Sequence, residues 1–283
     1  SGSVSLAVGA SATGVGGSVS ISAGVSSTST GGSVSLKTGS SSATASGRMS
    51  IASADSAAGS GHVSIKSGSA SAGNSGAIEM TTGTALIGQS GKILLVAGSS
   101  ETDVGGKIDL RAGSSNSQTG GSISFHSGDS ESVSSGSISV STGTTSAVSS
   151  SGSVSINTGD AESGNSGSVN IVTGDTLGEA AGSISFVAGT SQSAVASHLH
   201  FAAGDTTGEG SRGGDFVVAA GSGADLGGSI YLNAGQGQTL TGGHVELKSG
   251  SSEEGGSGQV SVSSASSSGV GGSGAILVQS GTG

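Results

Sequence analysis

The stretch Gly17-Ser18-Val19-Ser20-Ile21-Ser22-Ala23-Gly24 returns after about fifteen residues as Gly32-Ser33-Val34-Ser35-Leu36-Lys37-Thr38-Gly39. About nineteen such copies follow one another along the 283-residue chain, with little between them. A fixed short period is typical of a repeat architecture, in which each copy contacts mainly its neighbours. The sequence therefore predicts one continuous repeat array over residues 1–283, and we expect it to be part of a longer array.

Within each copy, apolar and polar residues alternate. Apolar residues stand two and four positions after the first glycine, as Val19 and Ile21 do after Gly17, and a small residue such as Ala23 stands six positions after it. Alternation with period two over seven residues is typical of a strand with one buried face. We therefore expect the apolar positions to face inward and the serines between them to face outward. The copies begin at Gly2, Gly17, Gly32, Gly47, Gly61, Gly76, Gly91, Gly106, Gly121, Gly136, Gly152, Gly167, Gly182, Ser197, Gly214, Gly228, Gly243, Gly258 and Gly274.

A Ser-rich bridge joins each copy to the next. Its second residue is always small, as at Ser11, Ser26 and Ala70, which predicts that this position faces a narrow interior. The bridge is then expected to return across the apolar face of the strand. A glycine precedes most bridges, but Ala54 and Ala265 replace it twice, so we expect ordinary backbone dihedral angles at this corner.

These features together predict an all-β fold, a parallel β-solenoid (β-helix) of about 19 coils with about 15 residues per coil and a flattened, narrow cross-section. Coils spaced by about 4.8 Å would form a rod about 85–90 Å long. The chief alternative is an antiparallel meander. It predicts that odd and even bridges differ, which they do not, and Ser-rich bridges of this length are poor hairpin turns. The solenoid is therefore the favoured prediction.

Composition limits the classes of partner. Glycine-rich and serine-rich chains are often flexible, but here the apolar residues are strictly placed. The absence of proline suits a backbone whose N–H groups are needed in ladders.

The net charge of −10 argues against nucleic acid as the main partner. No apolar run reaches the length of a membrane span, so we expect no membrane insertion. The chain has no cysteine and therefore no disulfide or thiolate metal site.

Charge and the two ends of the array suggest how copies of the chain would associate. Most cationic residues, such as Lys37, Lys92 and Lys107, stand at outward strand positions, whereas most acids stand in the bridges. This arrangement serves solubility, and it would also suit lateral contacts between neighbouring solenoids. Neither end carries an atypical polar cap, so we expect the array to continue in a longer chain or to stack end to end with itself.

Few residues suggest chemistry. His198 and His200 form a His-x-His pair with Asp215 in the matching place of the next copy, but no third firm metal ligand is identifiable. The run Gly208–Gly213 fits a dinucleotide-binding pattern, which is expected by chance in a glycine-rich chain without a following helix. Gly-Asp corners at Asp129, Asp160, Asp175 and Asp205 lack the spacing of calcium-binding β-rolls. We therefore assign no catalytic, cofactor or metal site and expect no enzymatic activity.

The runs Gly31–Gly39 (Gly-Gly-Ser-Val-Ser-Leu-Lys-Thr-Gly) and Gly120–Gly128 (Gly-Gly-Ser-Ile-Ser-Phe-His-Ser-Gly) carry a resemblance to known repeats. They resemble glycine- and serine-rich repeats of large algal and protist surface proteins, including flagellar-hair proteins, and of bacterial adhesin and phage-fibre β-solenoids. The resemblance implies a structural role outside the cell or at its surface, in a filament, fibre or stalk. An adhesin or viral-fibre binding module and an ice-binding solenoid remain the alternatives.

Overall fold

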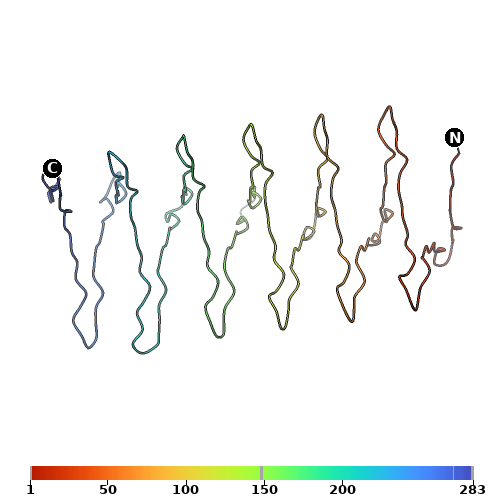
Figure 1. Ribbon diagram of the computed structural model, residues 1–283. Coiled ribbons are helices and arrows are strands. Elements are labelled where there is room, and N and C mark those ends of the chain that lie inside the picture. Colours follow the sequence, from red (N-terminus) through yellow and green to blue (C-terminus); the bar gives the residue numbers. More distant parts are fainter. Residues whose placement is uncertain (1, 147–148, 270, 282–283) are drawn as a thin grey trace. The chain divides into compact units, whose positions relative to one another are not determined.

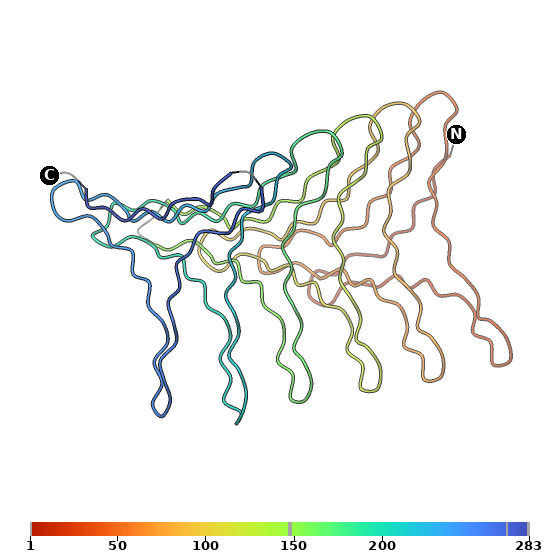
Figure 2. The ribbon, with the colours of Figure 1, turned by 60° about the vertical axis from the view of Figure 1, so that its left-hand side comes forward.

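The computed structural model describes residues 2–146, 149–269 and 271–281, and it contains no helix and no strand in these ranges. Figure 1 accordingly draws the chain as a plain tube, without coiled ribbons or arrows. The prediction of an all-β parallel β-solenoid was therefore wrong, and with it the ladders spaced by about 4.8 Å and the rod length derived from them. The chain instead alternates extended segments with narrow loops, as Figure 2 shows.

The bridges explain why the chain does not wind into coils. The N–H group of Gly32 donates a hydrogen bond of 2.8 Å to the carbonyl oxygen of Gly24, so the first and last residues of this bridge meet. In a coil, the bridge would carry the chain across the apolar face and separate these two glycines by the width of the coil. Each closed bridge is therefore a loop that reverses the chain direction.

The closure recurs along the chain. The chain consists of two units, Ser1–Ser139 and Val140–Gly283, and the hydrogen bond across the loop neck is found in both. In the first unit the donors are Gly32, Gly47, Gly106, Gly121 and Gly136, and in the second they are Gly214, Gly228, Gly243 and Gly258. Donor–acceptor distances lie between 2.8 and 3.0 Å, which is the usual length of an N–H···O bond.

A glycine facing a small residue makes each neck possible. A Cβ atom added to Gly106 would lie 3.0 Å from the Cβ of Ala97 and 3.1 Å from the carbonyl oxygen of Gly98. Real Cβ atoms rarely come so close, and larger side chains at either position would push the two segments apart. The pairs Gly32 with Ala23 and Gly121 with Ala112 repeat the arrangement. The first glycine and the sixth-position small residue of the repeat therefore face each other across a loop neck.

The predicted inward columns are exposed. Large apolar side chains in the described residues have exposed fractions from 48% at Ile184 to 108% at Leu177, and no described residue is buried. Ile123, predicted to lie in a sealed interior, is half exposed. The residues with intermediate exposure are nearly all sixth-position residues of the necks: Ala23, Thr38, Ala97, Ser127 and Ser249, together with Gly237.

The total accessible surface shows how little is covered. It is 27870 Å² for a chain of 25.9 kDa. A folded monomer of this mass exposes about 10,500 Å², and the same chain fully unfolded exposes about 37,600 Å². The chain therefore keeps about three quarters of its unfolded surface.

The prediction that the corner glycines have ordinary backbone dihedral angles was confirmed. Gly24, Gly39 and Gly98 have no positive φ, and a Cβ atom added to them would meet nothing within 4 Å. Alanine, which the sequence has at Ala54 and Ala265, therefore fits this position. Left-handed φ angles lie inside the bridges instead, at Gly73, Gly88, Gly164 and Gly210.

Candidate functional site: bridge loops, a charged cluster and a phenylalanine ladder

The small second residue of the bridge has a hydrogen-bonding role. Ser115 Oγ accepts a bond of 3.0 Å from the N–H group of Gln118, and Ser26 Oγ accepts one of 3.0 Å from Ser29. The same contact over three residues is made by Ser11, Ser41, Ser56, Ser100, Ser130, Thr176 and Ser252. Hydroxyl groups that bond to the following backbone favour turns over regular structure.

The prediction that the second residue of the bridge faces a narrow interior was therefore wrong. Ser26 and Ser115 are exposed, and the loop contains no interior for them to face. The small size is explained by the turn, because a short hydroxyl side chain reaches its own backbone three residues on. Alanine at Ala70 and Ala85 keeps the size but supplies no acceptor.

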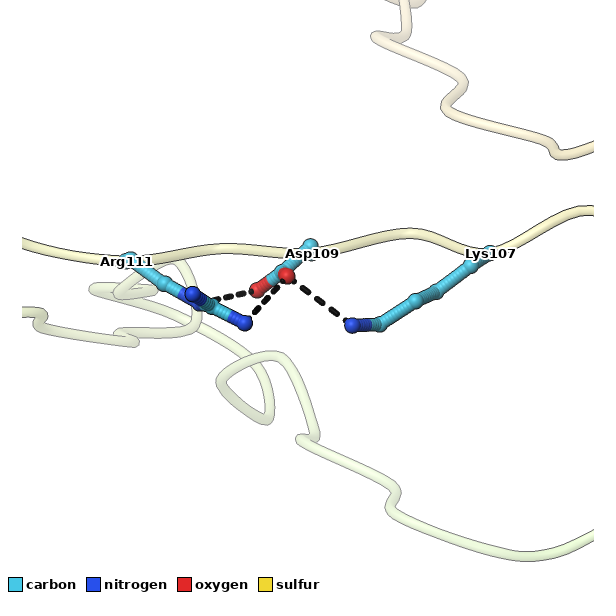
Figure 3. A network of polar contacts seen from close by, with 3 residues as sticks. All are labelled: Lys107, Asp109 and Arg111. Atoms are coloured by element: carbon cyan, nitrogen blue, oxygen red, sulfur yellow. Dashed lines mark hydrogen bonds and ion pairs between the residues drawn. The ribbon is translucent and has the colours of Figure 1, made fainter.

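A charged cluster lies on one extended segment of the first unit. The Asp109 carboxylate accepts a bond of 2.9 Å from Lys107 Nζ and one of 2.9 Å from Arg111 Nε, and the second guanidinium contact is 2.8 Å. Figure 3 shows the three side chains on the same side of the backbone, as alternation with period two predicts. All three are exposed, and exposed ion pairs of this kind contribute at most about 1 kcal/mol. The cluster carries one net positive charge in a chain of net charge −10.

Three of the four phenylalanines form a ladder in the second unit. The ring centroids of Phe186 and Phe201 lie 6.1 Å apart in an edge-to-face arrangement, and those of Phe201 and Phe216 lie 6.4 Å apart and stacked. These spacings are within the range of favourable aromatic pairs. Phe201 and Phe216 flank the neck that the bond of 3.0 Å from Gly214 to Gly204 closes. The fourth phenylalanine, Phe125, has no ring partner in the described residues.

The residues that suggested metal binding are not gathered into a site. The Asp215 carboxylate accepts bonds of 2.8 and 3.1 Å from the guanidinium of Arg212, while His198 and His200 lie exposed on the preceding segment. Among the residues that the structure describes, no group of three histidines and carboxylates is close enough to hold a metal ion. The Gly-Asp corners at Asp129, Asp160, Asp175 and Asp205 therefore form no such group either.

The run Gly208–Gly213 forms a compact turn. The Gly208 carbonyl oxygen accepts bonds from the N–H group (3.3 Å) and the hydroxyl of Ser211, Gly210 has φ of 71°, and Thr206 Oγ1 lies 3.0 Å from Ser211 Oγ. No helix follows it to receive a phosphate. No pocket was found in the described part of the chain. No described helix is long and apolar enough to cross a membrane.

Sequence reasoning missed two features. The preference for small residues at the second bridge position was interpreted as a size limit, although the frequent serine and threonine there also indicate a hydroxyl acceptor. The phenylalanine ladder was signalled by Phe186 and Phe201 at the fourth position of two successive copies and Phe216 at the second position of the next. Comparison with protein-family models, curated proteins and solved structures found no match.

Proposed function

We propose that the protein is a structural repeat protein of a filament, fibre or stalk outside the cell, and that copies of the chain associate with one another. The observation that carries the proposal is the exposed apolar surface. Apolar side chains make up 31% of the residues, and in the described part of the chain none of them is buried.

The area supports association over a monomeric role. The chain exposes about 17,000 Å² more than a folded monomer of its mass. A stable protein–protein interface needs only about 1,600 Å² in total. Large exposed apolar surfaces are typical of proteins that bind a partner. Several contacts of ordinary size could therefore form on one copy.

Uniform repetition suggests that the partner is another copy. The same neck, hydroxyl bond and apolar pattern recur in both units, so any contact that fits one repeat finds equivalent places along the whole chain. Repetition of one weak contact gives a strong total association. The placement outside the cell rests on the resemblance to surface and fibre repeats described above.

Electron microscopy of negatively stained native material tests the proposal, together with sedimentation of the purified chain over a range of concentrations. We expect filaments in the native material and a sedimentation coefficient that rises with concentration. Single particles in the native material, with no concentration dependence in solution, would contradict the proposal. Particles bearing a separate terminal binding domain would favour the adhesin alternative.

A further inference from the structure

The two units of the chain differ in charge. The first unit, Ser1–Ser139, has six cationic and seven acidic residues and therefore a net charge of −1. The second unit, Val140–Gly283, has two cationic and eleven acidic residues and therefore a net charge of −9. Because the same repeat pattern runs through both units, charge distinguishes surfaces that are otherwise alike.

The cationic residues of the first unit lie on the polar side of its extended segments, which we call the cationic side. Two acids, Glu79 and Asp109, share this side, so its net charge is +4. Asp109 pairs with two of the cations, and the other four have no ion-pair partner among the described residues. All six cations are exposed, and each stands one or five positions after the start of its copy: Lys37, Arg48, Lys66, Lys92, Lys107 and Arg111.

The acidic residues of the second unit lie mainly in its bridges, which hold nine of the eleven. Glu253 and Glu254 stand next to each other in one such bridge, exposed and without an ion-pair partner in the described residues. A bond of 3.0 Å from Gly258 to Gly250 closes the neck of this bridge, and Ser252 Oγ accepts a backbone bond within it. The turn therefore presents both carboxylates to solvent.

From this we infer that the cationic side of the first unit binds the acidic bridges of the second unit of another copy. The inference rests on the proposed function and names the two surfaces that would meet. The cationic side is the only net positive group when segments and bridges of each unit are compared, and the bridges of the second unit carry the largest negative charge, −8. Opposite charges steer association and determine which surfaces meet.

The repeat period favours a second copy as the source of the acidic groups. Acidic bridges and cationic segments recur with the same spacing of about fifteen residues, so one contact can repeat several times between two copies. An acidic partner without this period would not supply repeated contacts. Contact between two second units is disfavoured, because it would bring a charge of −9 against another of −9.

Two matched double variants of the full chain test the inference. Glu253→Lys with Glu254→Lys and Asp129→Lys with Glu131→Lys each remove two exposed bridge acids and change the net charge from −10 to −6, in the second and the first unit respectively. We expect the first pair to raise the concentration needed for association by about fivefold or more at low salt. The second pair should not raise it. If net charge alone governed association, both variants would associate more readily than the unaltered chain, and the inference would be wrong.

A charge swap provides a second readout. Lys37→Glu with Lys66→Glu reverses two charges of the cationic side and should also weaken association. Mixed with the variant Glu253→Lys with Glu254→Lys, it offers reversed but again opposite charges, so the equimolar mixture should associate more readily than either variant alone. A mixture that associates no better than its components would overturn the inference.

The outcomes separate the inference from the proposed function. If the unaltered chain associates and the two bridge variants behave alike, the pairing of unlike units is wrong while the structural role stands. If the unaltered chain stays monomeric at every concentration, both are wrong. Sedimentation at about 20 and 300 mM salt supplies the measurement, because screening at the higher salt should weaken the contact between exposed charges.

Discussion

At the scale of single residues, the glycine that closes a loop neck and the small residue six positions into the preceding copy face each other. At Gly106, an added Cβ atom would lie 3.0 Å from the methyl group of Ala97. The corner glycine Gly98 differs, because a Cβ atom there would meet nothing within 4 Å. The two glycines at the ends of one bridge, eight residues apart, therefore have different physical reasons for their positions.

Alanine substitution separates these two glycines. We expect Gly106→Ala to weaken the hydrogen bond to Gly98, because the methyl group would meet both Ala97 and the acceptor oxygen. A net loss of about 0.5–1.5 kcal/mol corresponds to amide exchange about 2–12 times faster at residue 106. The measurement is hydrogen exchange followed by NMR. Gly98→Ala is the control and should leave the exchange rate at residue 106 unchanged; equal effects of the two variants would contradict the steric account.

The bridge serine gives a second prediction at this scale. Replacing Ser115 with Ala removes the oxygen that accepts the Gln118 N–H at 3.0 Å. We expect faster exchange of the Gln118 amide, by a few-fold, since a neutral hydrogen bond contributes about 1 kcal/mol. Ser115→Thr keeps a hydroxyl and should restore the original rate, whereas Ser122→Ala, outside any bridge, should have no effect. Exchange that is unaffected by Ser115→Ala would show that the hydroxyl does not hold the turn.

At the scale of the repeat element, the alternation of apolar and polar residues predicted correctly which side chains share a side of an extended segment. Lys107, Asp109 and Arg111 lie together as period two requires. Alternation could not predict what would cover the apolar side, because that depends on where the bridge leads the chain. The bridge was expected to run back across the strand, but Gly24 and Gly32 meet at its two ends and the chain reverses. The antiparallel alternative anticipated such a reversal, although no described segment pairs as a strand.

The phenylalanine ladder belongs to this scale, because it joins three successive copies. Phe201 contacts both neighbours, so Phe201→Leu should remove both ring pairs and move the ring-proton resonances of Phe186 and Phe216 toward values of isolated rings. Phe125→Leu is the control, since Phe125 has no ring partner in the described residues. Resonances of Phe186 and Phe216 that do not respond to Phe201→Leu would contradict the ladder.

At the scale of the whole molecule, composition explains why a regular core is missing. Glycine accounts for 58 of 283 residues, and glycine has the greatest backbone entropy to lose on folding. Most copies have only two large apolar side chains in the extended segment, separated by one residue, and these offer little burial to offset that loss. The period and the composition were readable from the sequence. What covers the apolar side chains was not, because it depends on where each bridge leads the chain.

Calorimetry tests whether the single chain lacks a regular core. A folded chain of 283 residues has a heat-capacity change of unfolding of about 3.4–4.2 kcal/mol/K. Because this chain already exposes about three quarters of its unfolded surface, we expect the dilute monomer to show no cooperative heat-absorption peak. A peak should appear as association increases with concentration. A sharp transition whose height and temperature do not depend on concentration would contradict the expectation.

Hydrogen exchange of the dilute monomer, followed by mass spectrometry along the whole chain, tests the absence of a backbone ladder most directly. We predict near-intrinsic exchange across the apolar segments, including residues 93–96, with modest protection only at the neck glycines such as Gly106. Strong protection that recurs in every apolar segment of the monomer would contradict the account, because only a hydrogen-bonded ladder within one chain would produce it.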